Sequence, residues 1–385
     1  MIVSFISLGC DKNRVNTEQM MALCLQAGMT VQEDCAGSDV VVVNTCGFID
    51  SAKLEAIETI LSVAELKVAG QVGKILVTGC LSQRYQAELL EELPEVDGIM
   101  GTGSYGDIVS AVEKVAAGQA YSHFTDINAP VEELPRVIST PMHYAYLRIA
   151  EGCSNRCAYC VIPSLRGKFR SRTKESILEE ARLLAASGVK ELIIVAQDIT
   201  RYGIDLYGKV CLTELLKELC KLDFRWVRLH YLYPELIDDE LIDEIASEDK
   251  IVKYLDIPIQ HINDDILRRM NRRYDTARYL ESVALLRAYF SGVAVTTDLI
   301  TGFPGETEEE FEKTLAFLRR CAFAQIHVFP YSIRPGTRAA AMEQVPKSVK
   351  EARAARAGQV AAELYEKYLR SCVGQTFPVL FETAG

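Results

Sequence analysis

Apolar runs alternate with helical patterns along the first 120 residues. Ordinary globular chains place apolar runs in buried strands and apolar residues at helical spacing on one helix face. The strands expected are Ile2–Leu8, Val40–Asn44 and Lys74–Thr78, and the helices expected are Asn16–Ala27, Ser51 to about Lys67, and one near Gln83–Leu93. Strand–helix alternation predicts an α/β domain with a parallel sheet covered by helices.

A second series of strand and helix patterns begins near residue 143. The strands expected are Tyr146–Ala150, Glu191–Ala196, Trp226–Tyr231, Tyr254–Ile259, Val293–Ile300 and Gln325–Pro330. Helical patterns lie between them, for example Lys174–Ala186 and Thr307–Arg319, and the second of these opens with a capping box. Six strand–helix units predict a partial (βα)6 barrel, two units short of a closed eightfold one.

Segments without these patterns set the domain boundaries. Residues 121–142 hold three prolines and few periodic residues, and we interpret them as a linker between domains at 1–120 and 143–372. Lys347–Arg370 predicts a final amphipathic helix. Val373–Phe381 predicts the first strand of a further domain, truncated at 373–385, because a lone strand cannot bury a core of its own.

Composition narrows the class of protein. Hydrophobic residues make up 49% and charged residues 25%, as in a globular protein, and no apolar stretch is long enough to span a bilayer. No signal peptide is evident, so we expect a cytoplasmic location and no membrane partner. The net charge of −11 favours a basic partner and disfavours direct nucleic-acid binding. The twelve cysteines are too few for a disulfide scaffold and indicate metal binding or catalysis.

Three cysteines form a CxxxCxxC motif directly after a predicted strand. Cys153, Cys157 and Cys160 supply three thiolates, which are soft ligands suited to zinc or iron–sulfur clusters. A structural zinc site needs four ligands, and no local fourth ligand is present. The motif therefore predicts a 4Fe–4S cluster with one iron open to a substrate or cofactor.

A second group of three cysteines is spread over the first domain. Cys10, Cys46 and Cys80 each follow a predicted strand, and the carboxyl ends of parallel strands meet at one edge of a sheet. A glycine that permits a tight turn flanks each one: Gly9, Gly47 and Gly79. We expect a second three-thiolate cluster here. Core packing is expected for the remaining six: Cys24, Cys35, Cys211, Cys220, Cys321 and Cys372.

The CxxxCxxC motif at the start of a series of βα units resembles the radical S-adenosylmethionine superfamily. Together with the N-terminal cysteines, the chain resembles the methylthiotransferases of that superfamily, over essentially its whole length. The segment IPSLRGK after Cys160 is similar to the RimO type, and so are SLGCDKNRVNTE, VNTCGFIDSAK and RLHYLYP. Members of the family normally end in a small β-barrel (TRAM) domain, of which Val373–Phe381 would be the start.

The resemblance implies a transferase with two 4Fe–4S clusters and S-adenosylmethionine as cofactors. The cluster on Cys153, Cys157 and Cys160 would bind S-adenosylmethionine for radical formation, and the auxiliary cluster on Cys10, Cys46 and Cys80 would supply the sulfur species. A methylthio group would then be added to the β-carbon of an aspartate in the twelfth small-subunit ribosomal protein, with flavodoxin or ferredoxin as electron donor. The alternatives are a tRNA adenosine methylthiotransferase of MiaB type and a non-catalytic iron–sulfur or zinc protein.

Residues near the expected strand ends are further candidates. Cofactor contacts are expected from residues at or near strand ends and beside the cluster: Tyr159, Gln197 (beside Asp198), Gln260 (beside His261) and Gly302. Loop capping or core packing is the alternative for each, and we prefer a core role for His230 and His261. A basic run is expected either to contact the substrate or to form a solvated face; its members are Arg166, Lys168, Arg170 and Arg172. No catalytic residue beyond the cluster ligands is expected, since the cofactor performs the difficult chemistry.

Overall fold

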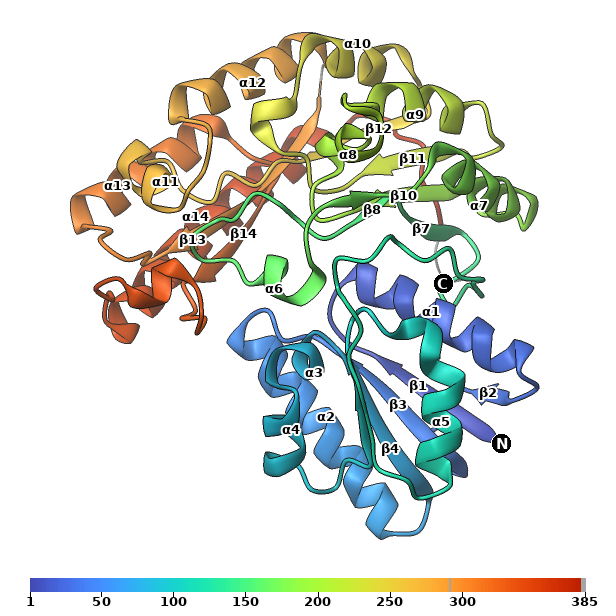
Figure 1. The fold of residues 1–385 in the computed structure, drawn as a ribbon. Coiled ribbons are helices and arrows are strands. Elements are labelled where there is room, and N and C mark those ends of the chain that lie inside the picture. The colour runs from blue at the N-terminus through green and yellow to red at the C-terminus, as the bar shows by residue number, and fades with distance from the viewer. Residues whose placement is uncertain (291, 382–385) are drawn as a thin grey trace. The chain divides into compact units, whose positions relative to one another are not determined.

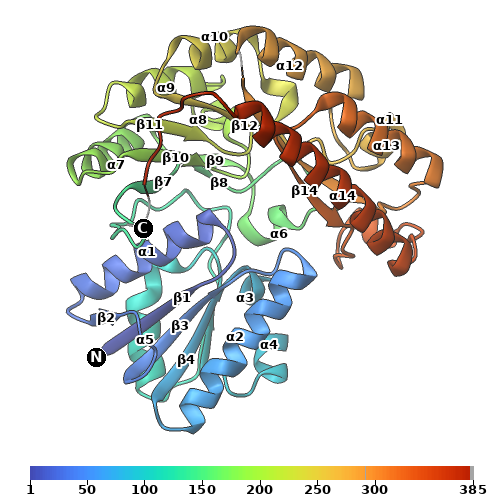
Figure 2. The same ribbon diagram turned by 180° about the vertical axis from the view of Figure 1, so that it is seen from behind.

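The chain divides into two compact units. The computed structural model describes residues 1–290 and 292–381, drawn as a ribbon in Figure 1 and from behind in Figure 2. The first unit contains Met1–Thr140, Glu151–Ser154 and Val161–Arg170, and the second contains Pro141–Ala150, Asn155–Cys160 and the chain from Ser171 onward. The boundary near residue 143 that the sequence predicts is therefore too simple, because two short segments beyond it pack with the first unit.

The first unit is built on a six-stranded parallel sheet. Its strand order is β2-β1-β3-β4-β5-β6. The strands are β1 (Ile2–Ser7), β2 (Thr30–Gln32), β3 (Ser38–Thr45), β4 (Val72–Gly79), β5 (Gly98–Met100) and β6 (Tyr121–His123). The central strand β3 is almost entirely buried, as its run of four valines predicts. The three strands expected from the sequence are confirmed.

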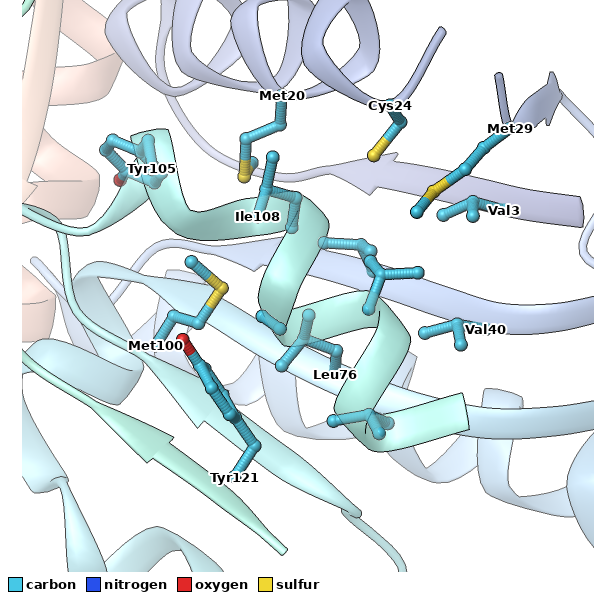
Figure 3. Packing of buried hydrophobic residues seen from close by; sticks show 14 residues of the cluster. Val3, Met20, Cys24, Met29, Val40, Leu76, Met100, Tyr105, Ile108 and Tyr121 are labelled. Atoms are coloured by element: carbon cyan, nitrogen blue, oxygen red, sulfur yellow. The ribbon is translucent and has the colours of Figure 1, made fainter. Parts of the chain in front are cut away.

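Helices cover both faces of this sheet. They are α1 (Asp11–Gln26), α2 (Asp50–Val68), α3 (Cys80–Tyr85), α4 (Ala87–Glu92) and α5 (Ile108–Ala116). A further short helix of this unit, α6 (Ile162–Arg166), packs on α3. Residues of α1 and α5 share one hydrophobic core, whose packing around Met20, Ile108 and Leu76 is shown in Figure 3. A second core on the other face joins α2 and α3 to β3 and β4. The alternating pattern thus predicts the fold of this unit correctly.

Two details of the first unit differ from the sequence-based expectations. The segment interpreted as a linker begins with β6, which pairs with β5 and buries Tyr121, so the first unit extends past residue 120. The single helix expected near Gln83–Leu93 is two short helices. Gln86, between them, has a φ of 45°, which interrupts the helix.

The second unit is also built on a parallel sheet of six strands. The strands run in chain order from β7 to β14, as β7 (Tyr144–Arg148), β10 (Glu191–Val195), β11 (Trp226–Leu229), β12 (Ile251–Asp256), β13 (Ala294–Thr301) and β14 (Gln325–Pro330). Within the described residues β7 and β14 do not pair, so the barrel is open. The six expected strands and the partial barrel are confirmed.

Helices follow the strands of the second unit in sequence, and Figures 1 and 2 show them on the outside of the curved sheet. They are α7 (Lys174–Ala186), α8 (Ile204–Tyr207), α9 (Leu212–Cys220), α10 (Asp239–Ser247), α11 (Asp264–Arg269), α12 (Thr276–Tyr289), α13 (Glu308–Cys321) and α14 (Lys347–Cys372). The capping box at Thr307 is present: its side chain accepts the Glu310 N–H, and the Glu310 carboxylate accepts the Thr307 N–H. A short pair of strands, β8 (Ala150–Glu151) and β9 (Arg170–Ser171), lies where the chain passes between units.

The segment after α14 differs from its expected structure. Residues 373–381 form no strand, and the apolar side chains Val373, Phe377 and Phe381 are exposed. A strand requires a partner for its hydrogen-bond ladder, and this segment pairs with none of the strands described above. The prediction of a strand at Val373–Phe381 is therefore wrong. Across the described parts of the chain, no helix is both long and apolar enough to cross a membrane.

Candidate active site

Cys10, Cys46 and Cys80 follow three neighbouring strands of the first unit. β1 pairs with β3 and β3 with β4, so the carboxyl ends of these strands form one rim. The chain also reverses its direction of winding between β1 and β3, and such a switch point is where open α/β sheets bind ligands. Cys10 is exposed, Cys46 is half-buried and Cys80 is buried. The sheet thus brings all three thiols to the edge that the sequence predicts.

Glycines allow the three turns to touch. Gly9 has a φ of 85°, and a Cβ at this residue would lie 2.5 Å from the Cβ of Cys46. A Cβ at Gly47 would lie 3.0 Å from the Cα of Leu81, next to Cys80. Gly79, with a φ of 94°, lies against the main chain of Thr45 in the same way. A Cβ would clash at Gly9 and Gly79 and would crowd the main chain of Leu81 at Gly47, so the close approach of the cysteine turns accounts for the three glycines.

The thiols also influence one another electrostatically. The pKa of Cys46 is raised to about 11, mainly by burial and to a smaller extent by the neighbouring Cys80 and Cys10. Burial likewise raises the pKa of Cys80, whereas the guanidinium of Arg166 lowers it. The three thiols therefore lie close enough to interact electrostatically in a partly buried site, and the guanidinium of Arg166 lies beside them.

Arg166 is that cation, and the sequence identifies it only as part of a basic run. It ends α6, a five-residue helix with proline in its first turn and Gly167 at a φ of 75° after it. Val161 and Leu165 bury one face of α6 against Cys80 and Phe48. Arg166 itself is only 3% exposed, so the expectation that it belongs to a solvated face is wrong.

The side chains of the other basic residues have different surroundings from the guanidinium of Arg166. Lys168 is exposed, and Arg170 donates to the main-chain carbonyl of Ile127. Arg172 belongs to the second unit, where its guanidinium donates to the carbonyl of Arg148 at 2.9 Å and to the carboxylate of Glu180 at 2.5 Å. Arg170 and Arg172 are thus held by groups of their own units, and a contact of this run with substrate stays a prediction.

The CxxxCxxC cysteines fall on both sides of the unit boundary. Cys153 packs with the first unit, where its N–H donates to the carbonyl of Gly167 at 3.1 Å. Cys157 and Cys160 pack with the second unit, and the Cys160 N–H donates to the carbonyl of Cys157 at 3.0 Å. Each half of the motif is thus held by its own local hydrogen bond.

A buried arginine lies beside Cys157 in the second unit. The Sγ of Cys157 is 3.5 Å from the hydroxyl of Tyr233 and 3.5 Å from an Nη1 of Arg272. The Arg272 guanidinium is held by the hydroxyl of Tyr274 at 3.0 Å and the carbonyl of Pro258 at 2.9 Å. The sequence does not single out Arg272, because it lies in a run of arginines that resembles a solvated surface.

Tyr159 lies in a hydrophobic cluster of the second unit. Its ring makes an edge-to-face contact with Phe303, with 6.4 Å between ring centroids, and its carbonyl accepts a hydrogen bond from Arg334 at 2.7 Å. Cys157 and Cys160 pack against the same cluster. Tyr159 is therefore part of a hydrophobic core that anchors the loop bearing the two cysteines, and its contact with a cofactor stays a prediction.

Three of the expected cofactor contacts lie beyond strands β10, β12 and β13. Gln197 is half-buried. Gln260 has a φ of 65° and is fixed to β13 by hydrogen bonds of its main chain to Asp298 and Ile300, each 2.8 Å long. The N–H of Gly302 donates to Glu306, and a Cβ at Gly302 would lie 2.5 Å from the Cγ of Lys350. Packing alone therefore accounts for the glycine at 302.

Asp198 and His261 are buried and hydrogen-bonded within the protein, whereas His230 is not fully buried. Asp198 is buried and caps the turn after β10 by accepting the N–H of Thr200. His261 is fully buried, with one ring nitrogen 3.0 Å from Glu306 and the other accepting the N–H of Asn263, as expected of a core histidine. His230 is only half-buried, so the expectation of a core histidine is wrong there.

The second sheet has one polar face that the sequence analysis does not identify. In parallel strands, residues that pair with one another lie on the same face of the sheet. On one face of this sheet most side chains are polar, and the residues between them along each strand are mostly apolar and pack beneath the helices. Its side chains are Tyr146, Ile193, Arg228, Tyr254, Asp256, Thr296, Asp298, Gln325 and His327. Polar residues at every second position inside otherwise apolar strands, as in Arg228 and Asp298, are the signal that reveals this face.

The donor groups suit a cluster better than a single ion. Among the residues that the structure describes, no three histidine, cysteine, aspartate or glutamate side chains are close enough to hold one metal ion. A cubane cluster accepts each thiolate on a different iron, so its ligands lie farther apart than those of one ion. The thiols and glycine turns at the first rim fit such a group.

Two family models match the chain. The model of the radical SAM superfamily matches residues 147–318, and that of "Uncharacterized protein family UPF0004" matches residues 2–101. The first match covers the partial barrel and its cysteine motif. The chain is therefore a radical S-adenosylmethionine enzyme, and S-adenosylmethionine and iron–sulfur clusters are its cofactors.

Curated relatives place the chain within that class. It is 46% identical over 385 residues to the ribosomal protein uS12 methylthiotransferase RimO of Lachnoclostridium phytofermentans, covering 99% of this chain and 88% of the relative. It is 48% identical over 378 residues to the protein of the same name from Anaeromyxobacter sp., covering 98% of this chain and 80% of the relative. The chain belongs to the RimO family of radical methylthiotransferases and is a transferase.

Solved structures support the fold. The radical S-adenosylmethionine methyltransferase TsrM from Kitasatospora setae, solved with cobalamin and a 4Fe–4S cluster, has a TM-score of 0.64 at 13% identity, covering 88% of this chain and 77% of that chain. The cobalamin-dependent enzyme OxsB has a TM-score of 0.57 at 10% identity, covering 95% of this chain and 56% of that chain. At these identities the likeness concerns the fold alone.

Proposed function

We propose that the chain adds a methylthio group to the β-carbon of an aspartate in ribosomal protein uS12. The observation that supports this most directly is 44–48% identity, over 98–99% of the chain, to relatives named for that activity. The net charge of −11 agrees with a basic ribosomal protein as substrate. The proposal places the enzyme in the cytoplasm, with flavodoxin or ferredoxin as electron donor.

The two cysteine groups take different roles in this proposal. Cys153, Cys157 and Cys160 hold the cluster that binds S-adenosylmethionine, and Cys10, Cys46 and Cys80 hold the auxiliary cluster. Both groups offer three thiolates, which are the ligands that iron–sulfur clusters prefer. The cofactors supply radical formation and the sulfur group that is transferred.

The residues of the chain bind and orient these groups. Arg272 and Tyr233 fix the position of the Cys157 sulfur, and the packing of Tyr159 on Phe303 fixes the loop between Cys157 and Cys160. We place S-adenosylmethionine near Tyr159, Gln197, Gln260 and Gly302. Gln260 is favoured by its φ of 65°, because a conformation that costs free energy is often retained for function.

Mass spectrometry tests the substrate. Ribosomal protein uS12 and tRNA are isolated from cells with and without the gene, and from cells complemented with a Cys157→Ala variant. We expect the methylthio mass to disappear from uS12 in the deletion strain and to return only with the unaltered gene. Loss of the methylthio group from tRNA adenosine alone would instead support the MiaB-type alternative, and loss from neither would support a non-catalytic role.

A further inference from the structure

A buried guanidinium lies beside the cysteine turns of the first unit: Val161 and Leu165, which precede Arg166, pack against Cys80, and Arg166 is only 3% exposed. Arg166 donates a hydrogen bond to Cys80, its positive charge acts on Cys46, and Cys10 acts on it in turn. These cysteines follow three different strands, so one cation serves a site that the whole sheet assembles. Burying a cation is costly unless charged or polar partners surround it, so the position of Arg166 requires an explanation.

Polar side chains also hold the guanidinium. Nη1 donates to the carboxylate of Glu151 at 3.0 Å and to the Oδ1 of Asn16 at 2.9 Å, and Nη2 donates to the Oδ1 of Asn13. Asn13 also donates from its own amide to the carbonyls of Leu8 and Thr45, at 2.9 and 3.0 Å. These carbonyls lie just before the turns of Cys10 and Cys46. The same side chain therefore fixes the guanidinium and two of the cysteine turns.

The charges at this site balance only in part. Glu151 compensates the charge of Arg166, but a cluster on three thiolates brings further negative charge into a partly buried site. Hydrogen bonds to ligand sulfurs and nearby charge are two of the means by which proteins set the reduction potential of a cluster. Arg166 supplies both to the same cluster.

We propose that Arg166 is a positioning residue that stabilises the negative charge of the auxiliary cluster through Cys80 and raises its reduction potential. This inference rests on the proposed function, which places a cluster on Cys10, Cys46 and Cys80. Within the first unit, the carbonyl of Gly167 also accepts the N–H of Cys153, so the loop that presents Arg166 also orients one ligand of the other cysteine group.

The experiment isolates the auxiliary cluster. In a full-length protein with Cys153, Cys157 and Cys160 all replaced by alanine, only the first group can hold a cluster. Arg166→Gln removes the charge, Arg166→Lys retains it, and Lys168→Gln removes an exposed cation two residues away as the matched control. Each protein is reconstituted without oxygen, and its iron content, its electron paramagnetic resonance spectrum after reduction and its midpoint potential are measured, with circular dichroism to monitor folding.

The expected result is about four irons in the background protein. Arg166→Gln shifts the midpoint potential to more negative values, Arg166→Lys restores most of the shift, and Lys168→Gln leaves it unchanged. If Arg166→Gln loses the cluster, retention in Arg166→Lys at a near-native potential supports the inference, and loss from both contradicts it.

An unchanged potential in Arg166→Gln would overturn the role of Arg166 and leave the proposed function intact. Equal shifts in Arg166→Gln and Arg166→Lys would indicate a packing effect and also overturn it. A background protein that binds no iron would overturn the auxiliary cluster itself, and with it both proposals.

Discussion

The two cysteine groups are formed in different ways. Cys153, Cys157 and Cys160 lie within eight residues, so a single loop supplies them. Cys10, Cys46 and Cys80 come from three strand ends, and their proximity depends on the strand order and on glycine turns that touch. The first arrangement is local and the second is a product of the whole sheet. The sites should therefore fail differently when the chain is altered.

A buried arginine is common to both. Arg272 contacts Cys157 in the second unit, and Arg166 contacts Cys80 in the first. Tyrosine hydroxyls and a carbonyl hold Arg272, whereas a carboxylate and two amide oxygens hold Arg166. Among the described residues, Arg166 is paired with the carboxylate of Glu151, whereas the hydrogen bonds of Arg272 go to neutral oxygens and to Cys157. The charge of Arg272 is therefore less compensated by the protein than that of Arg166. This difference in the partners of the two arginines indicates that the two clusters have different electrostatic environments.

Replacing one cysteine of each group should produce the largest and most distinct effects. Cys157→Ala removes a ligand of the proposed S-adenosylmethionine cluster, so we expect it to abolish formation of 5′-deoxyadenosine under reducing conditions. Cys46→Ala should retain 5′-deoxyadenosine formation and lose methylthio transfer to uS12. Both products are measured by liquid chromatography and mass spectrometry. Cys220→Ala, which alters a buried cysteine of α9 outside both groups, is the control. Formation of 5′-deoxyadenosine by Cys157→Ala would remove that residue from its role.

The iron content should show a smaller effect that also distinguishes the two cysteine groups. The unaltered protein, reconstituted without oxygen, should bind about eight irons as two clusters. Replacement of Cys10, Cys46 and Cys80 by alanine should leave about four, because the other group is complete without them. Iron and protein are quantified on the same samples. A content near four in the unaltered protein, unchanged by these substitutions, would contradict the auxiliary cluster.

Gly9→Ala tests whether the glycine turns assemble the first group. The left-handed conformation alone costs about 1–2 kcal/mol for a residue with a Cβ, and here the new Cβ would lie 2.5 Å from that of Cys46. Gly118→Ala is the matched control, because Gly118 has a φ of 75° but nothing within 4 Å of the added Cβ. Both variants should lower the midpoint of thermal unfolding, and only Gly9→Ala should lose up to about four irons. Equal iron contents would show that the turns need not touch.

The sequence predicts what depends on local pattern. Alternating apolar and helical segments locate β1, β3 and β4, and the rule that parallel strands end together locates their cysteines. Arg166 escapes this approach because its partners Asn16 and Asn13 are 150 and 153 residues away. No periodicity indicates that residues 161–170 return to the first unit. The predicted strand at Val373–Phe381 fails for a related reason, since alternation alone does not supply a pairing partner.

Asp97→Asn should give the smallest effect and tests the sheet itself. Asp97 precedes β5 and accepts hydrogen bonds from Lys67 at 2.6 Å, Lys74 at 2.9 Å and the N–H of Ile75 at 2.9 Å. Burial acts to raise the pKa of this carboxyl, but the two lysines and the N–H outweigh it, and the net pKa is lowered. The group links β4 to β5 and touches no cysteine. Its removal therefore weakens the sheet that supports the first group and leaves the second group intact.

The sign of the pH dependence follows from the lowered pKa. The carboxylate stabilises the fold above the unfolded pKa of about 3.9, and this contribution is lost as the pH falls through the folded value. Asp97→Asn should cost about 1–2 kcal/mol of unfolding free energy at pH 7, and the difference from the unaltered protein should shrink below about pH 4. Hydrogen exchange in β4 and β5, measured by mass spectrometry between pH 7 and about pH 2, checks this. A difference that persists unchanged at low pH would assign the effect to packing, and faster exchange in β10 or β11 would show that the two units do not unfold separately.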